Sequence, residues 1–171
     1  MILRSFLSSP VTKRHTERKI LQTHPIHLFR IIQDVDAYSK FLPLCSYSKI
    51  LRKDNDGRSF EATLTVGMPP FFQETYVSRV HVVPERWTVE TQSIESKMFD
   101  SLRSQWTLSP VDGFENTQCK VDFQVEMTVS DPVIRGALDT VLRQVAERQV
   151  DAFEKRCREI PLPHDLLPLQ Q

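Results

Sequence analysis

Apolar and polar residues alternate without a break over residues 119–129, CKVDFQVEMTV. Side chains along a β-strand point to its two faces in turn, so this two-residue period predicts a strand with one buried and one solvated face. The same period is visible over residues 60–66 and 102–108. Further apolar-rich runs predict strands at about 16–22, 46–52, 73–83 and 86–93. The turn-forming sequences at 54–57 and 110–113 are too short for parallel crossovers, so the strands after the first are expected to form an antiparallel meander.

A long helix is expected to follow the strands and to end at about residue 159. Ser130-Asp131-Pro132 provides a cap and a proline at the first helical position. The helix has one apolar face, made of Ala137, Leu138, Val141, Leu142, Val145, Ala146, Val150, Phe153, Cys157 and Ile160. Two short helices are expected after the first strand, at 25–34, with Thr23 as candidate cap, and at 35–41.

These elements can bury their apolar faces only if a curved sheet wraps around the long final helix. The sequence therefore predicts an α+β fold of the helix-grip type. Its curved antiparallel sheet has about seven strands, and two short helices follow the first strand. A curved sheet and a helix that stands off from it leave an apolar cavity, which is the usual setting of a small-molecule site.

Charge and cysteine content exclude several classes of protein. Lys plus Arg equals Asp plus Glu at 22 each, so no overall basic field draws the molecule to nucleic acid. Cys45, Cys119 and Cys157 are widely spaced and odd in number, which predicts reduced thiols and neither a disulfide framework nor a structural zinc site. No apolar run reaches the roughly 18–20 residues that span a bilayer, so any membrane contact is expected to be peripheral.

Residues 1–15 carry Arg4, Lys13 and Arg14, three serines and no acidic residue. This composition predicts a mitochondrial presequence. A disordered start is the alternative, because Pro10 would break a helix early. The domain itself is expected over residues 16–160, with an irregular proline-rich tail over 161–171.

The segment Tyr38-Ser39-Lys40-Phe41-Leu42-Pro43-Leu44-Cys45 resembles the Y-x-x-F-L-P-x-C signature of the coenzyme Q-binding proteins. These proteins and their bacterial relatives, the ribosome association toxins, belong to the START and polyketide-cyclase-like superfamily. Thr65-Val66-Gly67, Trp106 and Val121-Asp122-Phe123 follow at similar distances, so the resemblance covers about residues 17–160. The sequence departs from the pattern at Leu44, where an aromatic residue is common, and at 96–100, which replace a glycine-proline-phenylalanine turn.

The resemblance implies a START-like domain that binds ubiquinone or a polyprenyl precursor as a lipid carrier or chaperone, in support of respiratory electron transport and coenzyme Q biosynthesis. It implies no catalysis and no cofactor beyond coenzyme Q as the bound ligand. The expected location is the matrix side of the mitochondrial inner membrane, held peripherally. Respiratory complexes or coenzyme Q biosynthetic proteins are the expected partners, and no nucleic acid is expected.

Apolar residues at predicted turns are candidates for the cavity and its entrance. Residues 67–72 place large apolar side chains where turns are usually polar, and burying one Phe or Met is worth roughly 1.5–3 kcal/mol. Together with residues 41–43 and 98–99, this loop is expected to ring one entrance. The candidate ligand-binding residues are Phe41, Leu42, Pro43, Val66, Met68, Phe71, Phe72, Tyr76, Met98, Phe99, Trp106 and Val145, and the candidates for membrane contact are Lys40, Pro69 and Pro70.

Ordinary packing is the alternative for each of these candidates. Tyr76 and Trp87 have polar groups that suit a quinone head, but the strand at 73–83 does not alternate cleanly, so the face of Tyr76 stays open. Trp106 is expected to point inward, against either ligand or core, and the same choice stays open for Val145. Lys40 either meets lipid phosphates or is solvated.

Two other functions stay open. A surface that binds ribosomes or RNA, as in the related toxins, is opposed by the zero net charge and the presequence-like start. A cyclase-type enzyme needs an acid or base inside its cavity, and no catalytic residue is identified. His24 and His27 lack a third residue to complete a metal site and are expected on a helix surface.

Overall fold

The structure, a computed structural model, describes residues 9–68 and 72–163. Its elements are β1 (Val11–Leu21), α1 (Pro25–Gln33), the 3-10 helix η1 (Val35–Lys40), β2 (Cys45–Lys53), β3 (Ser59–Met68), β4 (Phe72–Val83), the 3-10 helix η2 (Pro84–Arg86), β5 (Thr88–Glu95), β6 (Ser101–Pro110), β7 (Cys119–Val129) and α2 (Pro132–Glu159). This order confirms the predicted succession of strand, two short helices, six strands and long helix. No helix within these ranges combines the length and the apolar character needed to cross a bilayer.

The strands form one antiparallel sheet in the order β1-β7-β6-β5-β4-β3-β2. Consecutive strands from β2 to β7 are neighbours, which confirms the predicted meander. β1 pairs with β7 along its whole length, from Val11 opposite Val129 to Leu21 opposite Cys119. The alternation read from β7 is also confirmed, because Val121, Phe123 and other members of its apolar set are buried.

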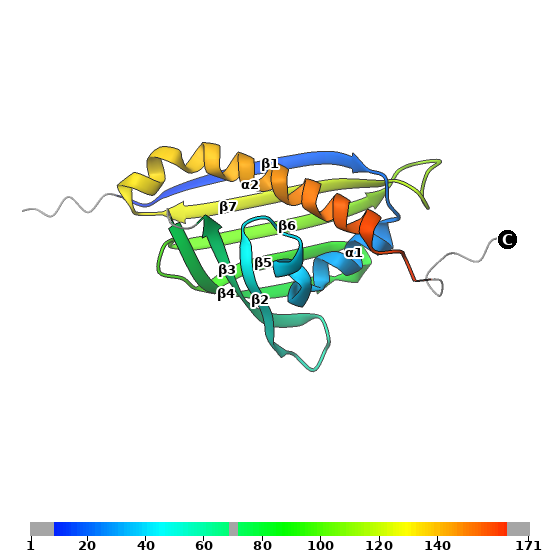
Figure 1. Cartoon of the computed structure of the whole chain (residues 1–171), viewed down its shortest axis with the longest axis horizontal. Helices are drawn as coiled ribbons and strands as arrows, with labels where there is room; N and C mark the ends of the chain where they lie inside the picture. The colour runs from blue at the N-terminus through cyan, green and yellow to red at the C-terminus, as the bar shows by residue number, and fades with distance from the viewer. Residues whose placement is uncertain (1–8, 69–71, 164–171) are drawn as a thin grey trace, which may run out of the picture.

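The helix α2 lies along one face of the sheet, over β1 and β7 (Figure 1). The carboxylate of Asp131 caps it by accepting hydrogen bonds from the backbone N–H groups of Val133 and Ile134, at 2.8 and 3.1 Å. Phe153 packs edge-on against Trp106 of β6, with ring centroids 4.9 Å apart. The buried residues of α2 all belong to the predicted apolar face: Leu138, Leu142, Ala146, Val150, Phe153 and Cys157. The helix-grip fold is therefore confirmed.

The cap of α1 is His24 and not Thr23. His24 Nδ1 accepts a hydrogen bond from the Ile26 N–H at 3.1 Å, whereas Thr23 is buried. Both side chains precede Pro25 and carry a hydrogen-bond acceptor. The path of the backbone into the helix decides which acceptor reaches the Ile26 N–H. In η1, Tyr38 donates its hydroxyl to the Ile32 carbonyl, which fastens η1 to α1.

β1 begins at Val11, earlier than the predicted start at residue 16. The domain boundary expected after His15 therefore falls inside a strand, whose residues 11–15 pair with 125–129 of β7. Arg14, one of the cations that suggested a presequence, donates a hydrogen bond to Glu126 across the strands at 2.6 Å, and the presequence itself stays a prediction. A short segment with alternating exposure has no strong apolar pattern of its own, so its partner strand determines where it begins. Residues 1–8 and 164–171 lie outside the described residues.

Candidate ligand cavity

A cavity with two lobes lies between α2 and the inner face of the sheet. The outer lobe has a volume of about 200 Å³ and the inner lobe about 100 Å³. The lobes adjoin, because Leu42, Cys45 and Val66 line both of them. Buried side chains such as Val80 and Val89 enclose the inner lobe. The fold thus supplies the apolar cavity that the sequence predicts.

The outer lobe reaches the molecular surface beside α2. Pro43 is exposed in the segment that precedes β2, and Val141 and Arg148 are exposed on α2. All three residues line the outer lobe, and none of them lines the inner one. The cavity therefore opens between this segment and α2, with the Arg148 guanidinium at its edge.

Several residues proposed from the sequence line this cavity. Those on the outer lobe are Leu42, Pro43, Val66, Tyr76, Phe99 and Val145, and Trp106 lines the inner lobe. Trp106 is 2% exposed and points inward as expected. Val141 and Leu142 also line the outer lobe, so this part of α2 faces the cavity as well as the core.

Three other proposed residues lie away from the cavity wall. Phe41 packs edge-on against two core rings, with centroids 5.1 and 5.8 Å away. Met98 packs against the core without lining either lobe. Trp87, proposed as a contact for a quinone head, packs against Phe29 at a centroid distance of 5.5 Å. Apolar character favours burial of a side chain, and the fold gives these three a protein neighbour instead of the cavity.

The loop between β3 and β4 is only partly described. Pro69, Pro70 and Phe71 lie outside the described residues, and so do the side chains of Met68 and Phe72, whose backbones pair at the ends of β3 and β4. Their role at an entrance stays a prediction. Lys40 is exposed at the end of η1, and its contact with a membrane also stays a prediction.

Pairing with β3 determines which side chains of β4 point inward. Tyr76 lies opposite Leu64, and Ser78 lies opposite Ala62. Directly opposite residues of an antiparallel pair share a face, and both β3 residues are buried. Tyr76 and Ser78 therefore point to the inner face, which resolves the ambiguity that the β4 sequence left.

A third inward residue of β4 is Glu74, which is buried and stabilises the turn beside the cavity wall. Its carboxylate accepts hydrogen bonds from the Lys97 backbone N–H at 2.9 Å and from the Ser96 hydroxyl at 3.3 Å. These bonds hold the turn before β6, so that the ring of Phe99 meets the ring of Tyr76 at 5.4 Å. Glu74 is thus a structural residue that sequence reasoning missed.

Five polar side chains line both lobes: Tyr76, Ser78, Thr91, Ser104 and Gln149. Only Tyr76 was proposed from the sequence. The signal that could have identified Ser104 is its position in the alternating run 102–108, where all the remaining inward residues are apolar. The convergence of all five on one place comes from four separate elements and has no local signature.

Burial raises the pKa of the titratable groups on the cavity wall. For the Tyr76 and Tyr38 hydroxyls and the Cys45 thiol, the largest cause of the raised pKa is the loss of water around the charged form. All three groups are therefore neutral near pH 7. No Asp, Glu, His or Lys lines either lobe among the described residues, so the charge on the described wall is that of Arg148. Such a wall suits a neutral and mainly apolar ligand.

The two histidines at the start of α1, His24 and His27, have roles in the fold. His27 is buried, and not on a helix surface as expected, because α1 packs against α2. Its burial lowers the pKa of the imidazole, and the nearby His24 and Arg30 act in the same direction. Among the described residues, no group of three or more His, Cys, Asp or Glu side chains is placed to hold a metal ion.

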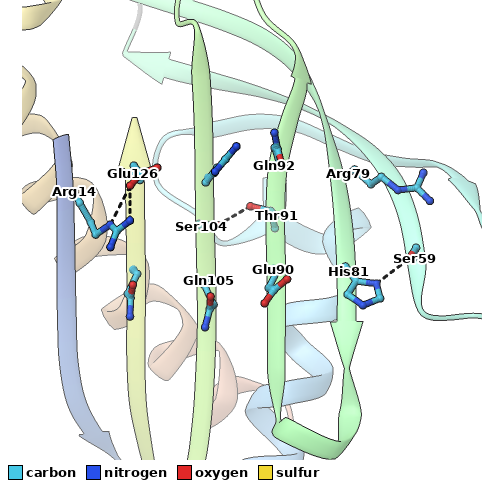
Figure 2. A pocket seen from close by; sticks show the side chains of 12 residues that line it. Arg14, Ser59, Arg79, His81, Glu90, Thr91, Gln92, Ser104, Gln105 and Glu126 are labelled. Carbon is cyan, nitrogen blue, oxygen red and sulfur yellow. Dashed lines mark hydrogen bonds and ion pairs between the residues drawn. The ribbon is translucent and has the colours of Figure 1, made fainter. Parts of the chain in front are cut away.

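A wider, polar depression of about 500 Å³ lies on the opposite face of the sheet (Figure 2). A row of outward side chains crosses the strands of this face: Arg14, Glu126, Arg103, Gln92, Arg79, Glu61 and Arg52, of which the first five line the depression. Arg14 pairs with Glu126 at 2.6 Å, as the dashed lines in Figure 2 show. Arg103 has no ion-pair partner in the described part of the chain. An open surface of this polarity does not suit a long apolar ligand.

Comparisons with known proteins identify a family and several relatives. The family described as "Polyketide cyclase / dehydrase and lipid transport" matches residues 23–154. The "Coenzyme Q-binding protein COQ10 homolog B, mitochondrial" of Xenopus laevis is 30% identical over 155 residues, which are 86% of this chain and 62% of that protein. The chain thus spans less than two thirds of that relative.

Two further similarities concern a bacterial protein and a solved structure. The "Ribosome association toxin RatA" of Pseudomonas aeruginosa is 26% identical over 147 residues, which are 85% of this chain and 96% of that protein. The Zhui aromatase/cyclase from Streptomyces sp. R1128 superposes with a TM-score of 0.76 at 13% identity, covering 87% of this chain and 95% of the other. This second likeness shows a common fold.

Proposed function

Because the chain belongs to the polyketide cyclase / dehydrase and lipid transport family, we propose that it binds coenzyme Q or a polyprenyl precursor and serves as a carrier or chaperone for this lipid. The observation that carries the proposal is the two-lobed cavity, with its mainly apolar wall and no acidic group among its described residues. The printed name of the Xenopus relative supports the choice of ligand.

The hydrophobic effect supplies the affinity that this function requires. Each methylene group of an isoprenoid tail that leaves water for an apolar wall gains about 0.8 kcal/mol. The lobes, at about 200 and 100 Å³, are small beside typical ligand pockets of roughly 300–1,000 Å³. The cavity therefore holds the head group and the first part of the tail, and the rest of the tail extends through the opening.

The proposed function needs no chemical reaction. Acid–base catalysis requires a group that changes protonation near the working pH at the reacting atom. On the described wall, burial raises the pKa of Tyr76 and Cys45 and so keeps both groups neutral. The likeness to an aromatase/cyclase concerns the fold, at 13% identity. A carrier needs only to enclose its ligand and to release it.

The proposed place of action is the matrix side of the mitochondrial inner membrane, with peripheral attachment. A lipid that enters beside α2 has to come from a bilayer, and the opening presents Pro43, Val141 and the Arg148 guanidinium to that bilayer. A cation at the opening favours the phosphate groups of an anionic leaflet. Delivery of coenzyme Q there supports respiratory electron transport and coenzyme Q biosynthesis, whose proteins are the proposed partners.

The first test is organic extraction and mass spectrometry of the protein purified from a host that produces ubiquinone. We expect ubiquinone in the wild type and a strong loss of it in Val145→Trp, because the indole would fill the outer lobe. The matched control is Val133→Trp, the same change on the same helix at a residue that is 84% exposed. Circular dichroism of each variant checks that the fold is retained.

Wild-type protein that carries no quinone and binds none when it is added would contradict the carrier function. Equal quinone content in Val145→Trp and Val133→Trp would place the ligand outside this cavity. Loss of quinone from both variants while both stay folded would show that binding depends on α2 in a way that the cavity does not explain.

A surface that binds ribosomes is the second candidate function, and one observation favours it. The chain covers 96% of the bacterial relative named as a ribosome association toxin. The outer face of the sheet carries the cross-strand row of side chains, which contains four arginines: Arg14, Arg103, Arg79 and Arg52. Most of those arginines are paired with acidic residues, and the net charge of the chain is zero. Co-sedimentation with ribosomes that Arg103→Glu abolishes, together with quinone-free protein, would favour this function over lipid carriage.

A further inference from the structure

The junction between the two lobes is polar, although the walls around it are apolar. The five polar side chains described above, from Tyr76 to Gln149, each line both lobes and therefore surround this junction. They come from β4, β5, β6 and α2, so the polar group faces the junction from the sheet and from the helix. An inner sheet face packed only against protein would be expected to carry apolar residues at these positions.

The hydrogen-bonding capacity of the junction is only partly used. Thr91 and Ser104 face each other across β5 and β6, and their hydroxyl oxygens are 2.6 Å apart (Figure 2). The Tyr76 hydroxyl, the Ser78 hydroxyl and the Gln149 amide have no hydrogen-bond partner in the described part of the chain. Ser78 is only 5% exposed. Tyr76 and Gln149 are partly buried, and all three side chains line the cavity, so their free hydrogen-bonding groups are available to a molecule bound there.

The unpaired groups define the chemistry of that molecule. A Tyr or Ser hydroxyl and a carboxamide N–H each donate a hydrogen bond, and a ring carbonyl or ether oxygen can only accept one. The ring of Trp106 and the ring of Tyr38 line the inner lobe next to the junction, so a flat ring there meets aromatic faces and edges. The junction therefore matches an aromatic or quinonoid ring that bears several oxygen atoms.

We propose that the oxygen-bearing ring of the ligand occupies the junction, where Tyr76, Ser78 and Gln149 donate hydrogen bonds to its oxygens. The ring enters first, and the isoprenoid tail runs along the outer lobe to the opening at Pro43 and Val141. This inference rests on the proposed function and adds to it the site and the orientation of the head group. It assigns selectivity for the head to the junction and general affinity for the tail to the apolar wall.

The reverse orientation fits the cavity less well. The inner lobe, at about 100 Å³, is enclosed by buried residues and leaves no path for a long chain to continue. The outer lobe is larger and reaches the surface. A tail that entered first would have to end inside the inner lobe, and the ring oxygens would then lie away from the donors that are otherwise unpaired.

The experiment compares two probes with the same tail: ubiquinone with a two-isoprene tail, and geranylbenzene, whose ring carries no oxygen atom. Dissociation constants are measured by titration calorimetry for the wild type, Tyr76→Phe and Ser78→Ala. Each substitution removes a single oxygen atom, so the cavity keeps its shape. We expect the quinone to bind the wild type more tightly than the oxygen-free probe. Each variant is expected to weaken quinone binding roughly 3- to 10-fold and to leave the oxygen-free probe unchanged.

Matched controls remove the same groups from the surface. Tyr47→Phe changes a tyrosine that is 51% exposed, and Ser109→Ala changes an exposed hydroxyl of β6. Both controls are expected to bind the two probes as the wild type does. Variants of Tyr76 and Ser78 that bind quinone normally, or that lose both probes equally, would overturn the proposed head-group site but not the proposed function of the wild type. Wild-type protein that binds neither probe would instead overturn the proposed function, and this inference with it.

Discussion

Buried polar residues in this protein fall into two groups, according to whether the chain itself pairs them. Glu74 accepts two hydrogen bonds from the turn before β6, and Ser48 accepts one from the Ser39 N–H at 3.0 Å. Removing either side chain would leave backbone N–H groups without their partners. Ser78 is as deeply buried and Tyr76 is partly buried, and neither side chain has such a role in the described part of the chain. At the scale of single residues, this difference separates groups that hold the fold from groups available to a ligand.

The cysteines give a prediction at the same scale. Burial raises the pKa of the Cys119 thiol to about 12 and that of Cys157 to about 11. Because the thiolate is the reactive form, both residues should react with iodoacetamide at pH 8 slower by a factor on the order of 100 or more in the folded protein than in urea. Mass spectrometry after timed quenching measures the two rates.

The same raised pKa values predict a loss of stability in alkaline solution. An unfolded thiol ionises near its ordinary pKa of 9.0, whereas the folded ones hold their protons until about 11 and 12. Since the folded state then binds more protons, the free energy of unfolding should fall as the pH rises from 9 through 12. For both predictions, alkylation of the folded protein as fast as that in urea would show that these thiols are not buried in solution.

At the scale of elements, α2 both lines the cavity and stabilises the fold. It supplies the wall residues Val145 and Gln149, and Lys19 of β1 ties it to the sheet. The Lys19 ammonium donates to Asp151 at 2.8 Å and to Glu154 at 3.0 Å. These hydrogen bonds raise the pKa of Lys19 above its ordinary value, so folding favours the charged ammonium.

The cap of α2 gives a prediction that involves no cavity residue. Asp131→Ala removes the acceptor of two backbone N–H groups and should lower the free energy of unfolding by about 0.5–2 kcal/mol. Asp131→Asn keeps an oxygen acceptor and should lose much less. Urea denaturation of the three proteins, followed by circular dichroism, measures the difference. If alanine and asparagine were equally destabilising, the charge of Asp131, and not its acceptor, would be the stabilising feature.

At the scale of the whole molecule, the two faces of one sheet have different surroundings. The inner face and α2 enclose the apolar cavity, while the outer face carries charged residues that are largely paired with one another. A ligand bound between α2 and the sheet contacts residues from Ile32 of α1 to Gln149 of α2. It should therefore stabilise the fold as a unit and not only one loop.

Ligand binding is accordingly predicted to raise the unfolding temperature of the entire domain. A ligand at 100 times its dissociation constant stabilises the native state by about 2.7 kcal/mol. Short-tailed ubiquinone should raise the midpoint of the wild type and of Val133→Trp by several degrees, and should leave that of Val145→Trp nearly unchanged. Scanning calorimetry gives the midpoints. An equal rise in all three proteins would mean that the quinone binds outside the cavity.

Much of the fold follows from periodic patterns in the sequence. The two-residue period of residues 119–129 determined which face of β7 is buried, and the apolar face of 137–160 determined which side of α2 packs against the sheet. Short connections with turn chemistry determined the meander. Of the site, the sequence identified wall residues such as Leu42, Val66 and Phe99, because apolar side chains near predicted turns have to be buried somewhere.

Only the tertiary structure decided what those side chains are buried against. Phe41 and Trp87 pack against aromatic neighbours away from the cavity, whereas Phe99 packs against Tyr76 and also lines the cavity, although all three are apolar and lie near turns. The start of β1 depends on β7, and the inward face of β4 depends on its register with β3. A local pattern specifies which face of an element avoids water. Whether a buried polar group then finds a partner or an open space depends on how far α2 stands from the sheet, which no single segment encodes.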